Sequence, residues 1–213
     1  MYQGRGYYYL TNLLDPLCGI VFALPAVWIY NGAIRKGGWK QALLLSVLTV
    51  YLCEMFNIVG IPAIQCLTWD PSVNLIPFAD FGQRAFFFGF SMNIVMLLPL
   101  GFLLPLLWKS LRSWKRAALA GFCLSLFIEL SQLFCFRATD IDDLIANTLG
   151  TALGYAAARL LFRNRWNSDT VPDSGRVSPA LDLAICIAIP VFVFLFLRTP
   201  LLDYLYTRFL MKV

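Results

Sequence analysis

Six apolar stretches, each about 20 residues long, constrain the fold of this chain more than any other feature of its sequence. They lie near residues 13–32, 41–60, 85–108, 116–136, 141–162 and 180–199. A helix of about 20 apolar residues crosses a hydrocarbon core of about 30 Å with every backbone polar group satisfied internally. Charged residues make up only 14% of the 213 positions, against roughly 25% in soluble domains. The sequence therefore predicts an all-α, polytopic integral membrane helical bundle with about six transmembrane helices.

The domain organisation follows from the placement of these stretches. We expect a single membrane domain over residues 1–213, located in the cell membrane as a multi-pass protein. The N-terminal stretch has no small-residue cleavage site, so the first apolar segment is expected to be retained. The polar stretch at 163–179 predicts a cytoplasmic linker, and 180–199 an additional transmembrane helix.

The basic residues indicate the orientation. Eleven of the 17 lie after the first, third and fifth apolar stretches. Loops rich in Lys and Arg stay on the cytoplasmic side of a membrane. Both termini, the loop near 61–84 and the loop between the fourth and fifth apolar stretches are therefore predicted to be extracytoplasmic. The basic residues in question are Arg35, Lys36, Lys40, Lys109, Arg112, Lys115, Arg116, Arg159, Arg163, Arg165 and Arg176.

Several classes of chemistry are disfavoured by what the sequence lacks. It contains no histidine, and its six cysteines form no Cys-x-x-Cys pair, which removes the usual zinc ligand sets and His-dependent acid–base schemes. No cofactor is evident, although paired carboxylates leave a divalent cation as an alternative. No basic run with interleaved aromatic residues indicates nucleic acid. Whether Cys66 and Cys135 form a disulfide stays open, since sequence cannot show that they meet.

Four polar residues stand inside the apolar stretches. An ionisable side chain at the centre of a membrane helix costs about 2.5–3.5 kcal/mol on insertion scales, so such residues indicate function. At about 1.5 Å per residue, Glu54, Asn93 and Glu129 fall at one depth, about two-thirds of the way outward. Gln132 lies one turn above Glu129. These residues are predicted to share a water-accessible pocket, with a purely structural hydrogen-bond network as the alternative.

The segment FRATDIDDLIANTLG, residues 136–150, is predicted to complete this pocket from above. Asp140 is suited to cap free backbone N–H groups at a helix start. Asp142 and Asp143 would then lie in the first turn, where the positive end of the helix dipole favours carboxylates. The alternative is that the aspartates only cap the helix and form an ion pair with Arg137, without binding a ligand.

A single stripe continues along the same predicted helix. Asp143, Asn147, Gly150 and Gly154 recur at helical spacing. The lower half of the stripe is Gly-x-x-x-Gly, a pattern that lets membrane helices approach closely. The stripe is therefore predicted to face a neighbouring helix, with the two glycines serving packing.

Four ordered motifs carry a resemblance to a known family. They are NLIPF at 74–78, NIVMLLPLGF at 93–102, SLFIELSQLF at 125–134 and RATDIDDLIANTLG at 137–150. Together they resemble the VanZ-like family of bacterial membrane proteins over about residues 74–162, the VanZ-like core of the chain.

The resemblance implies a role and a set of positions. The family takes its name from a protein that accompanies glycopeptide-resistance clusters and is associated with low-level resistance to teicoplanin. Carried over by motif, the positions are Asn74, Pro77, Phe78, Asn93, Pro99, Gly101, Glu129, Gln132, Arg137, Asp140, Asp142, Asp143 and Asn147.

Three functions compete. The first is a non-enzymatic envelope protein whose outward-facing pocket binds an envelope lipid, a lipid-linked cell-wall precursor or the antibiotic, with Arg84 and Arg137 against an anionic group. The second is a membrane enzyme or carrier that acts on a lipid-linked phosphate; catalysis is disfavoured, since no nucleophile–base pair is evident. The third is an assembly partner, with its oligomeric state open. The predicted ligand-binding residues are Glu54, Asn93, Glu129, Gln132, Arg137, Asp140, Asp142, Asp143 and Asn147.

Overall fold

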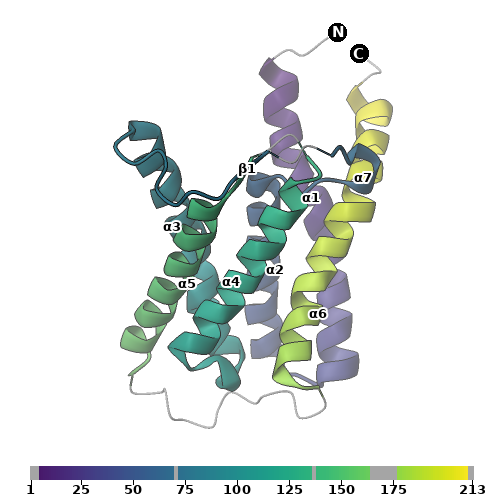
Figure 1. Ribbon diagram of the computed structural model, residues 1–213. Helices are drawn as coiled ribbons and strands as arrows, with labels where there is room; N and C mark the ends of the chain where they lie inside the picture. Colours follow the sequence, from purple (N-terminus) through teal and green to yellow (C-terminus); the bar gives the residue numbers. More distant parts are fainter. Residues whose placement is uncertain (1–4, 70–71, 136–137, 164–176, 211–213) are drawn as a thin grey trace. The chain divides into compact units, whose positions relative to one another are not determined.

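The chain folds almost entirely into helices, which confirms the predicted all-α helical bundle. The computed structural model describes residues 5–69, 72–135, 138–163 and 177–210 (Figure 1). Two compact units are present, one of Met1–Leu67 with Arg176–Val213 and one of Thr68–Gly175. That the two act as a single membrane domain stays a prediction. Most of the predicted linker at 163–179 lies outside the described residues.

The first unit is built around α1 (Arg5–Tyr30), which continues as a π-helical turn, η1 (Asn31–Arg35). Helix α2 (Trp39–Val59) packs along α1. It stops at Gly60, whose φ of 73° is the left-handed conformation that commonly ends helices. A short 3₁₀ turn, η2 (Ile64–Cys66), follows.

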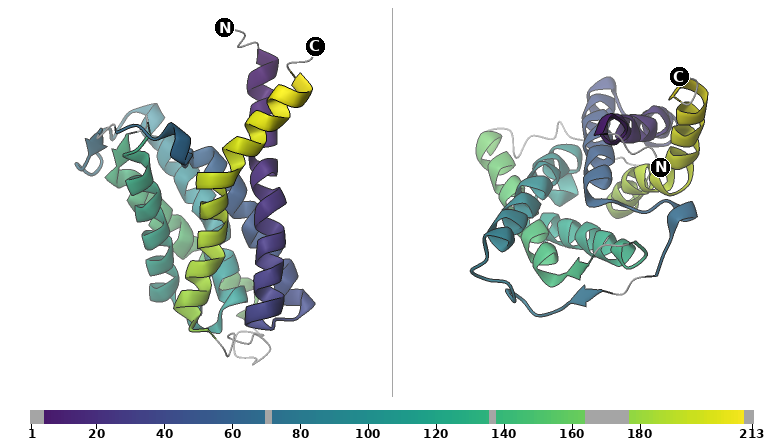
Figure 2. Two further views of the ribbon diagram at one scale, coloured as in Figure 1. Left: turned by 90° about the vertical axis from the view of Figure 1, so that its right-hand side faces the viewer. Right: turned by 90° about the horizontal axis from the view of Figure 1, so that it is seen from above.

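The last helical run of the chain belongs to the same unit. Helix α6 (Pro179–Phe192) starts with a proline at its first position, after Ser178, whose hydroxyl accepts the N–H of Leu181 at 3.4 Å. The run continues through η5 (Val193–Leu197), α7 (Arg198–Leu205) and η6 (Tyr206–Leu210). Figure 2 shows it running along α1, which both α6 and α7 contact.

A buried ion pair fixes α6 to the end of α1. Arg35 Nε lies 3.2 Å from Asp182 Oδ2, and both side chains are 0% exposed. The hydroxyl of Tyr30 donates to Asp182 Oδ1 at 2.7 Å. A buried carboxylate is tolerated only when it is paired and hydrogen-bonded. These contacts therefore determine where the additional helix docks.

The second unit contains three helices joined by short connections. They are α3 (Arg84–Leu107), α4 (Trp114–Gln132) and α5 (Ile141–Leu161), with a 3₁₀ turn, η3 (Lys109–Leu111), between the first two. Helix α5 packs against both α3 and α4 (Figure 1). Two short strands, β1 (Val73–Asn74) and β2 (Thr139–Asp140), pair in parallel, so the segment before α3 is held beside the start of α5.

Glycines set the spacing between α3 and α5. A Cβ atom on Gly101 would overlap the backbone carbonyl of Thr151, and one on Gly150 or Gly154 would overlap the carbonyl of Ile94 or of Leu98. Such backbone-to-backbone contact is possible only without side chains. The predicted packing role of Gly150 and Gly154 is therefore confirmed.

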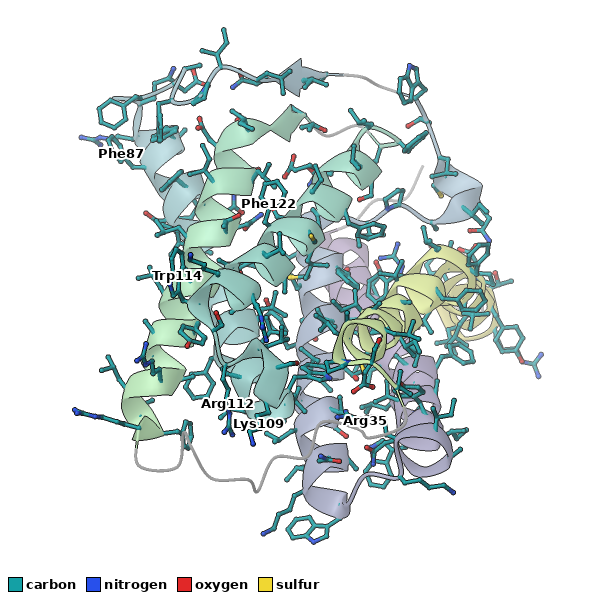
Figure 3. All side chains as sticks on the ribbon, turned by 60° about the horizontal axis from the view of Figure 1, so that its bottom comes forward. Arg35, Phe87, Lys109, Arg112, Trp114 and Phe122 are labelled. Carbon is teal, nitrogen blue, oxygen red and sulfur yellow. The ribbon has the colours of Figure 1, made fainter. Side chains whose placement is uncertain are left out.

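The second unit has two chemically different ends. At the end called here the site end, β1 and β2 meet the start of α3, the last turn of α4 and the start of α5. At the basic end lie the turn between α3 and α4 and the last turn of α5. Figure 3 shows Phe87 near the site end, and Lys109 and Arg112 at the basic end. The basic residues there are Lys109, Arg112, Lys115, Arg116 and Arg159.

Length and composition support four of the six predicted membrane spans. Within the described part of the chain, the helices long and apolar enough to cross a membrane are Leu14–Arg35, Trp39–Cys66, Arg84–Leu107 and Pro179–Arg208. The other two predicted spans correspond to α4 and α5, which have 19 and 21 residues. Both carry more polar side chains, because α4 begins with Lys115 and Arg116 and α5 begins with the aspartates.

Candidate functional site

The start of α5 is capped as the sequence predicts. Asp140 has extended backbone before the helix, and its Oδ1 accepts the N–H of Asp142 at 2.9 Å. Its other carboxylate oxygen, Oδ2, accepts a hydrogen bond from Nδ2 of Asn74 at 3.1 Å. Asn74 belongs to β1, directly opposite Asp140 in the parallel pair. One carboxylate therefore joins the helix start to the NLIPF segment.

Glu129 contacts this cap from α4. The residue is 4% exposed, and its Oε2 accepts the backbone N–H of Asp140 at 3.0 Å. Its backbone carbonyl accepts the hydroxyl of Thr139, also at 3.0 Å. Gln132, one turn further along α4, is buried as well. The acidic residue of α4 and the capping residue of α5 thus form one hydrogen-bonded unit.

Asp142 holds a turn in the segment before α3. It is 5% exposed, and both of its carboxylate oxygens lie 3.0 Å from the backbone nitrogen of Phe78, which donates to them. Phe78 has a φ of 58°, a left-handed conformation that is rare for a bulky residue. The described contacts of Asp142 therefore serve the fold: this carboxylate stabilises a backbone turn 64 positions earlier in the chain.

Replacing Asp142 with asparagine is expected to release this turn. The substitution keeps the shape but removes a charge-assisted hydrogen bond, which contributes about 1.5–3 kcal/mol. Hydrogen exchange at the Phe78 amide should accelerate by roughly 10- to 100-fold if local opening controls it. The control is Asp80→Asn, an exposed carboxylate whose described partner is the side chain of Gln83. Unchanged exchange at Phe78 in Asp142→Asn would contradict the anchoring role.

Two amide side chains link the polar face of α5 to the neighbouring helices α3 and α4. Asn93 of α3 donates from Nδ2 to Asp143 Oδ1. Asn147, 2% exposed, donates from Nδ2 to the hydroxyl oxygen of Ser125 at 2.9 Å. Within the described part of the chain its Oδ1 has no hydrogen-bond partner. A buried acceptor without a partner is costly, so Asn147 Oδ1 is suited to accept a hydrogen bond from water or from a ligand.

Sequence reasoning missed Ser125 and Thr151. Ser125 is 0% exposed and precedes Glu129 by four residues, so both lie on one face of α4. Thr151, also 0% exposed, follows Asn147 by four residues on α5 and donates to the Asn147 carbonyl at 3.0 Å. The i, i+4 spacing from residues already singled out was the signal that would have found both.

Three predicted residues remain, namely Glu54, Arg84 and Arg137. Glu54 is exposed on α2, in the first unit, so its membership of the site stays a prediction. Arg84 is exposed at the first position of α3. Arg137 lies outside the described residues. All six cysteines are free thiols, so Cys66 and Cys135 are not joined in this structure.

The chemistry of the site end is dominated by hydrogen-bond acceptors. Carboxylate oxygens only accept when ionised, so the arrangement suits a ligand that offers O–H or N–H donors. Among the residues that the structure describes, no three His, Cys, Asp or Glu side chains are grouped as metal ligands would be. The side chains that gather here are Asn74, Asn93, Glu129, Gln132, Asp140, Asp142, Asp143 and Asn147.

Comparison with known proteins identifies a family. A family model described as VanZ/LLP1 matches residues 42–163, which is more than half of the chain. The match begins in α2, well before the first recognisable motif, and ends just after α5. Helices α6 and α7 lie outside it. No curated protein and no solved structure matches significantly.

Proposed function

The chain belongs to the VanZ/LLP1 family, and we propose that it is an envelope membrane protein that binds a polar ligand at an outward-facing site. The ligand is the head group of an envelope lipid, a lipid-linked cell-wall precursor or a glycopeptide antibiotic. Binding there contributes to resistance of the teicoplanin type. The protein acts by binding this ligand and so reducing the access of the antibiotic to its target.

One observation carries this proposal, namely the convergence of polar side chains from distant parts of the sequence. Asn74 and Asn93 come from before and within α3, Glu129 from α4, and Asp140 and Asp143 from α5. A helix cap alone needs none of the polar groups on α3 and α4. Polar side chains inside membrane helices are expensive and are kept where they function.

The basic residues support the outward orientation. In the second unit the basic end carries Lys109, Arg112, Lys115 and Arg116, and positively charged ends of membrane helices face the cytoplasm. The site end then faces outward. In the first unit, Arg35, Lys36 and Lys40 lie at the turn between α1 and α2, which supports extracytoplasmic placement of both termini. The binding site is therefore reached from outside the cell.

Glu129→Gln and Asp143→Asn test the proposal. Each removes the negative charge that would accept a hydrogen bond from the ligand. A charge-assisted hydrogen bond contributes about 1.5–3 kcal/mol, equivalent to roughly 10- to 100-fold in affinity. The minimal inhibitory concentration of teicoplanin, measured in a susceptible host that expresses each variant, should fall to that of the host alone. Asp80→Asn, which alters an exposed carboxylate outside the network, should behave like the unmodified protein.

The amount of each variant in the membrane must match the unmodified protein for this comparison to count. Full resistance in both Glu129→Gln and Asp143→Asn at matched expression would contradict the proposed site. Mass spectrometry of envelope lipids and precursors, with and without the protein, separates binding from turnover. Unchanged precursors support binding, whereas a changed precursor pool favours the enzyme or carrier.

A further inference from the structure

A group of exposed apolar side chains lies beside the site end of the second unit. We call it the aromatic rim and define it as Leu75, Ile76, Phe78, Phe81, Phe87 and Phe88. Their exposed fractions run from 46% at Phe78 to 71% at Phe88. All six lie within residues 75–88, and so many exposed large apolar side chains in one short segment indicate an interaction surface.

The rim has a defined structure. Phe86 packs against Phe78, Phe81 and Phe90, with ring centroids 5.6–6.2 Å apart. The backbone N–H of Phe78 is held by Asp142. Aromatic pairs at these separations stabilise the fold beyond simple burial. The exposed rings therefore project from the turn that Asp142 anchors, at Phe78 and Phe81, and from the first turns of α3, at Phe87 and Phe88.

The rim continues the surface that a membrane covers. Helix α3 is long and apolar enough to cross a membrane. On it Phe88, Met92 and Val95 are exposed and lie on one helical face, at 71%, 51% and 60%. Figure 3 shows Phe87 near the end of α3 from which the rim extends. Acyl chains that cover this face of α3 therefore reach the aromatic rim at the site end of the helix.

The charge of residues 72–90 indicates how the rim contacts a membrane. Between residues 72 and 90 the ionisable side chains are Asp80 and Arg84, one of each sign. Attraction to anionic head groups needs a basic cluster, which this segment lacks. Aromatic rings, by contrast, favour the boundary between head groups and acyl chains. The occupant that fits is a lipid bilayer, held by the hydrophobic effect.

We propose that the aromatic rim is seated in the outer leaflet, about 5–10 Å below the head-group level, as interfacial apolar surfaces are. The assignment to the outer leaflet rests on the proposed function and its orientation. The insertion of the rim into a leaflet does not rest on them. The polar site beside the rim then opens into the head-group layer, and its ligand arrives by lateral diffusion in the membrane. This favours an amphiphile, with its polar part at Asp140 and Asp143 and its chain along the rim.

Depth measurements on spin labels test this proposal. Single cysteines at positions 76 and 81 are introduced into a variant whose six native cysteines are replaced, and are labelled after reconstitution into phosphatidylcholine–phosphatidylglycerol vesicles. Controls carry the label at Ser72 or Asp80, exposed residues outside the rim. Labels at 76 and 81 should collide with oxygen in preference to a water-soluble nickel chelate. The controls should show the reverse.

Two results would overturn the proposal. Equal access of the nickel chelate to positions 76, 81 and 80 would place the rim in water. Poor access of both oxygen and nickel at 76 and 81 would mean that protein, a second copy or another partner, covers the rim. The measurement does not involve teicoplanin, so it can fail while the Glu129→Gln and Asp143→Asn predictions hold, and the reverse.

Discussion

Replacing Gly101 with alanine is expected to destabilise the second unit strongly, whereas the same change at Gly89, in the same helix, is not. A methyl group on Gly101 would overlap the backbone carbonyl of Thr151, while nothing lies within 4 Å of the corresponding position at Gly89. Backbone cannot rotate away as a side chain can, so α3 and α5 must separate. Overpacking of this kind costs about 1–3 kcal/mol, occasionally more.

The expected readout is a shift in thermal unfolding. For a chain of about 200 residues, 1 kcal/mol corresponds to roughly 2–4 °C in Tm, so the Tm of Gly101→Ala should be about 2–12 °C lower. Gly89→Ala should melt at the same temperature or higher, since alanine favours helix over glycine by about 1 kcal/mol. Circular dichroism in detergent micelles measures both variants. Equal stability of Gly101→Ala and the unmodified protein would contradict the close approach of the helices.

The glycine spacing was predictable because it is a local signal. Gly150 and Gly154 stand four residues apart on an otherwise apolar helix, and the pattern alone indicates a close partner. The cap at Asp140 was predictable for a related reason, since a cap depends on its own neighbours in sequence. Helix positions, glycine contacts and the cap therefore follow from stretches of fewer than about 20 residues.

The anchor between Asp142 and Phe78 was not predictable in this way. It joins residues 64 positions apart and requires a left-handed backbone at a phenylalanine. Sequence position placed Asp142 in the first turn of α5 but not the direction of its side chain. The same limit applies to Glu54, whose depth was estimated from its position along a helix. Depth does not specify which face of the helix carries the side chain.

Arg35 has a structural role that its loop position does not indicate. In the sequence it counts as one of three basic residues in a loop, which indicates the cytoplasmic side. In the structure it is buried and paired with Asp182, a residue in the first turn of a distant apolar helix. Loop charges are usually solvated, and the partner lies 147 positions away. The pairing therefore depends on tertiary packing that no local pattern encodes.

Asp182→Asn is expected to cause a large loss of stability in the first unit. The substitution leaves the guanidinium of Arg35 buried without its carboxylate. Removal of one partner of a buried ion pair costs about 3–5 kcal/mol, or roughly 6–20 °C in Tm for a chain of this size. A second ion pair of the same unit, Asp15 with Arg198 at 3.2 Å, offers the control. Its side chains are 23% and 11% exposed, so Asp15→Asn should cost less.

A triple variant separates an unpaired charge from a packing defect. Tyr30→Phe, Arg35→Met and Asp182→Leu together replace the buried polar cluster with apolar side chains of similar volume. Since apolar replacement of a whole buried ion pair is often neutral or stabilising by about 1–4 kcal/mol, the triple variant should melt above Asp182→Asn. If both melt equally early, the loss comes from packing around α6 and not from the charge of Arg35. If Asp182→Asn melts like the unmodified protein, the buried pair does not hold α6 to α1.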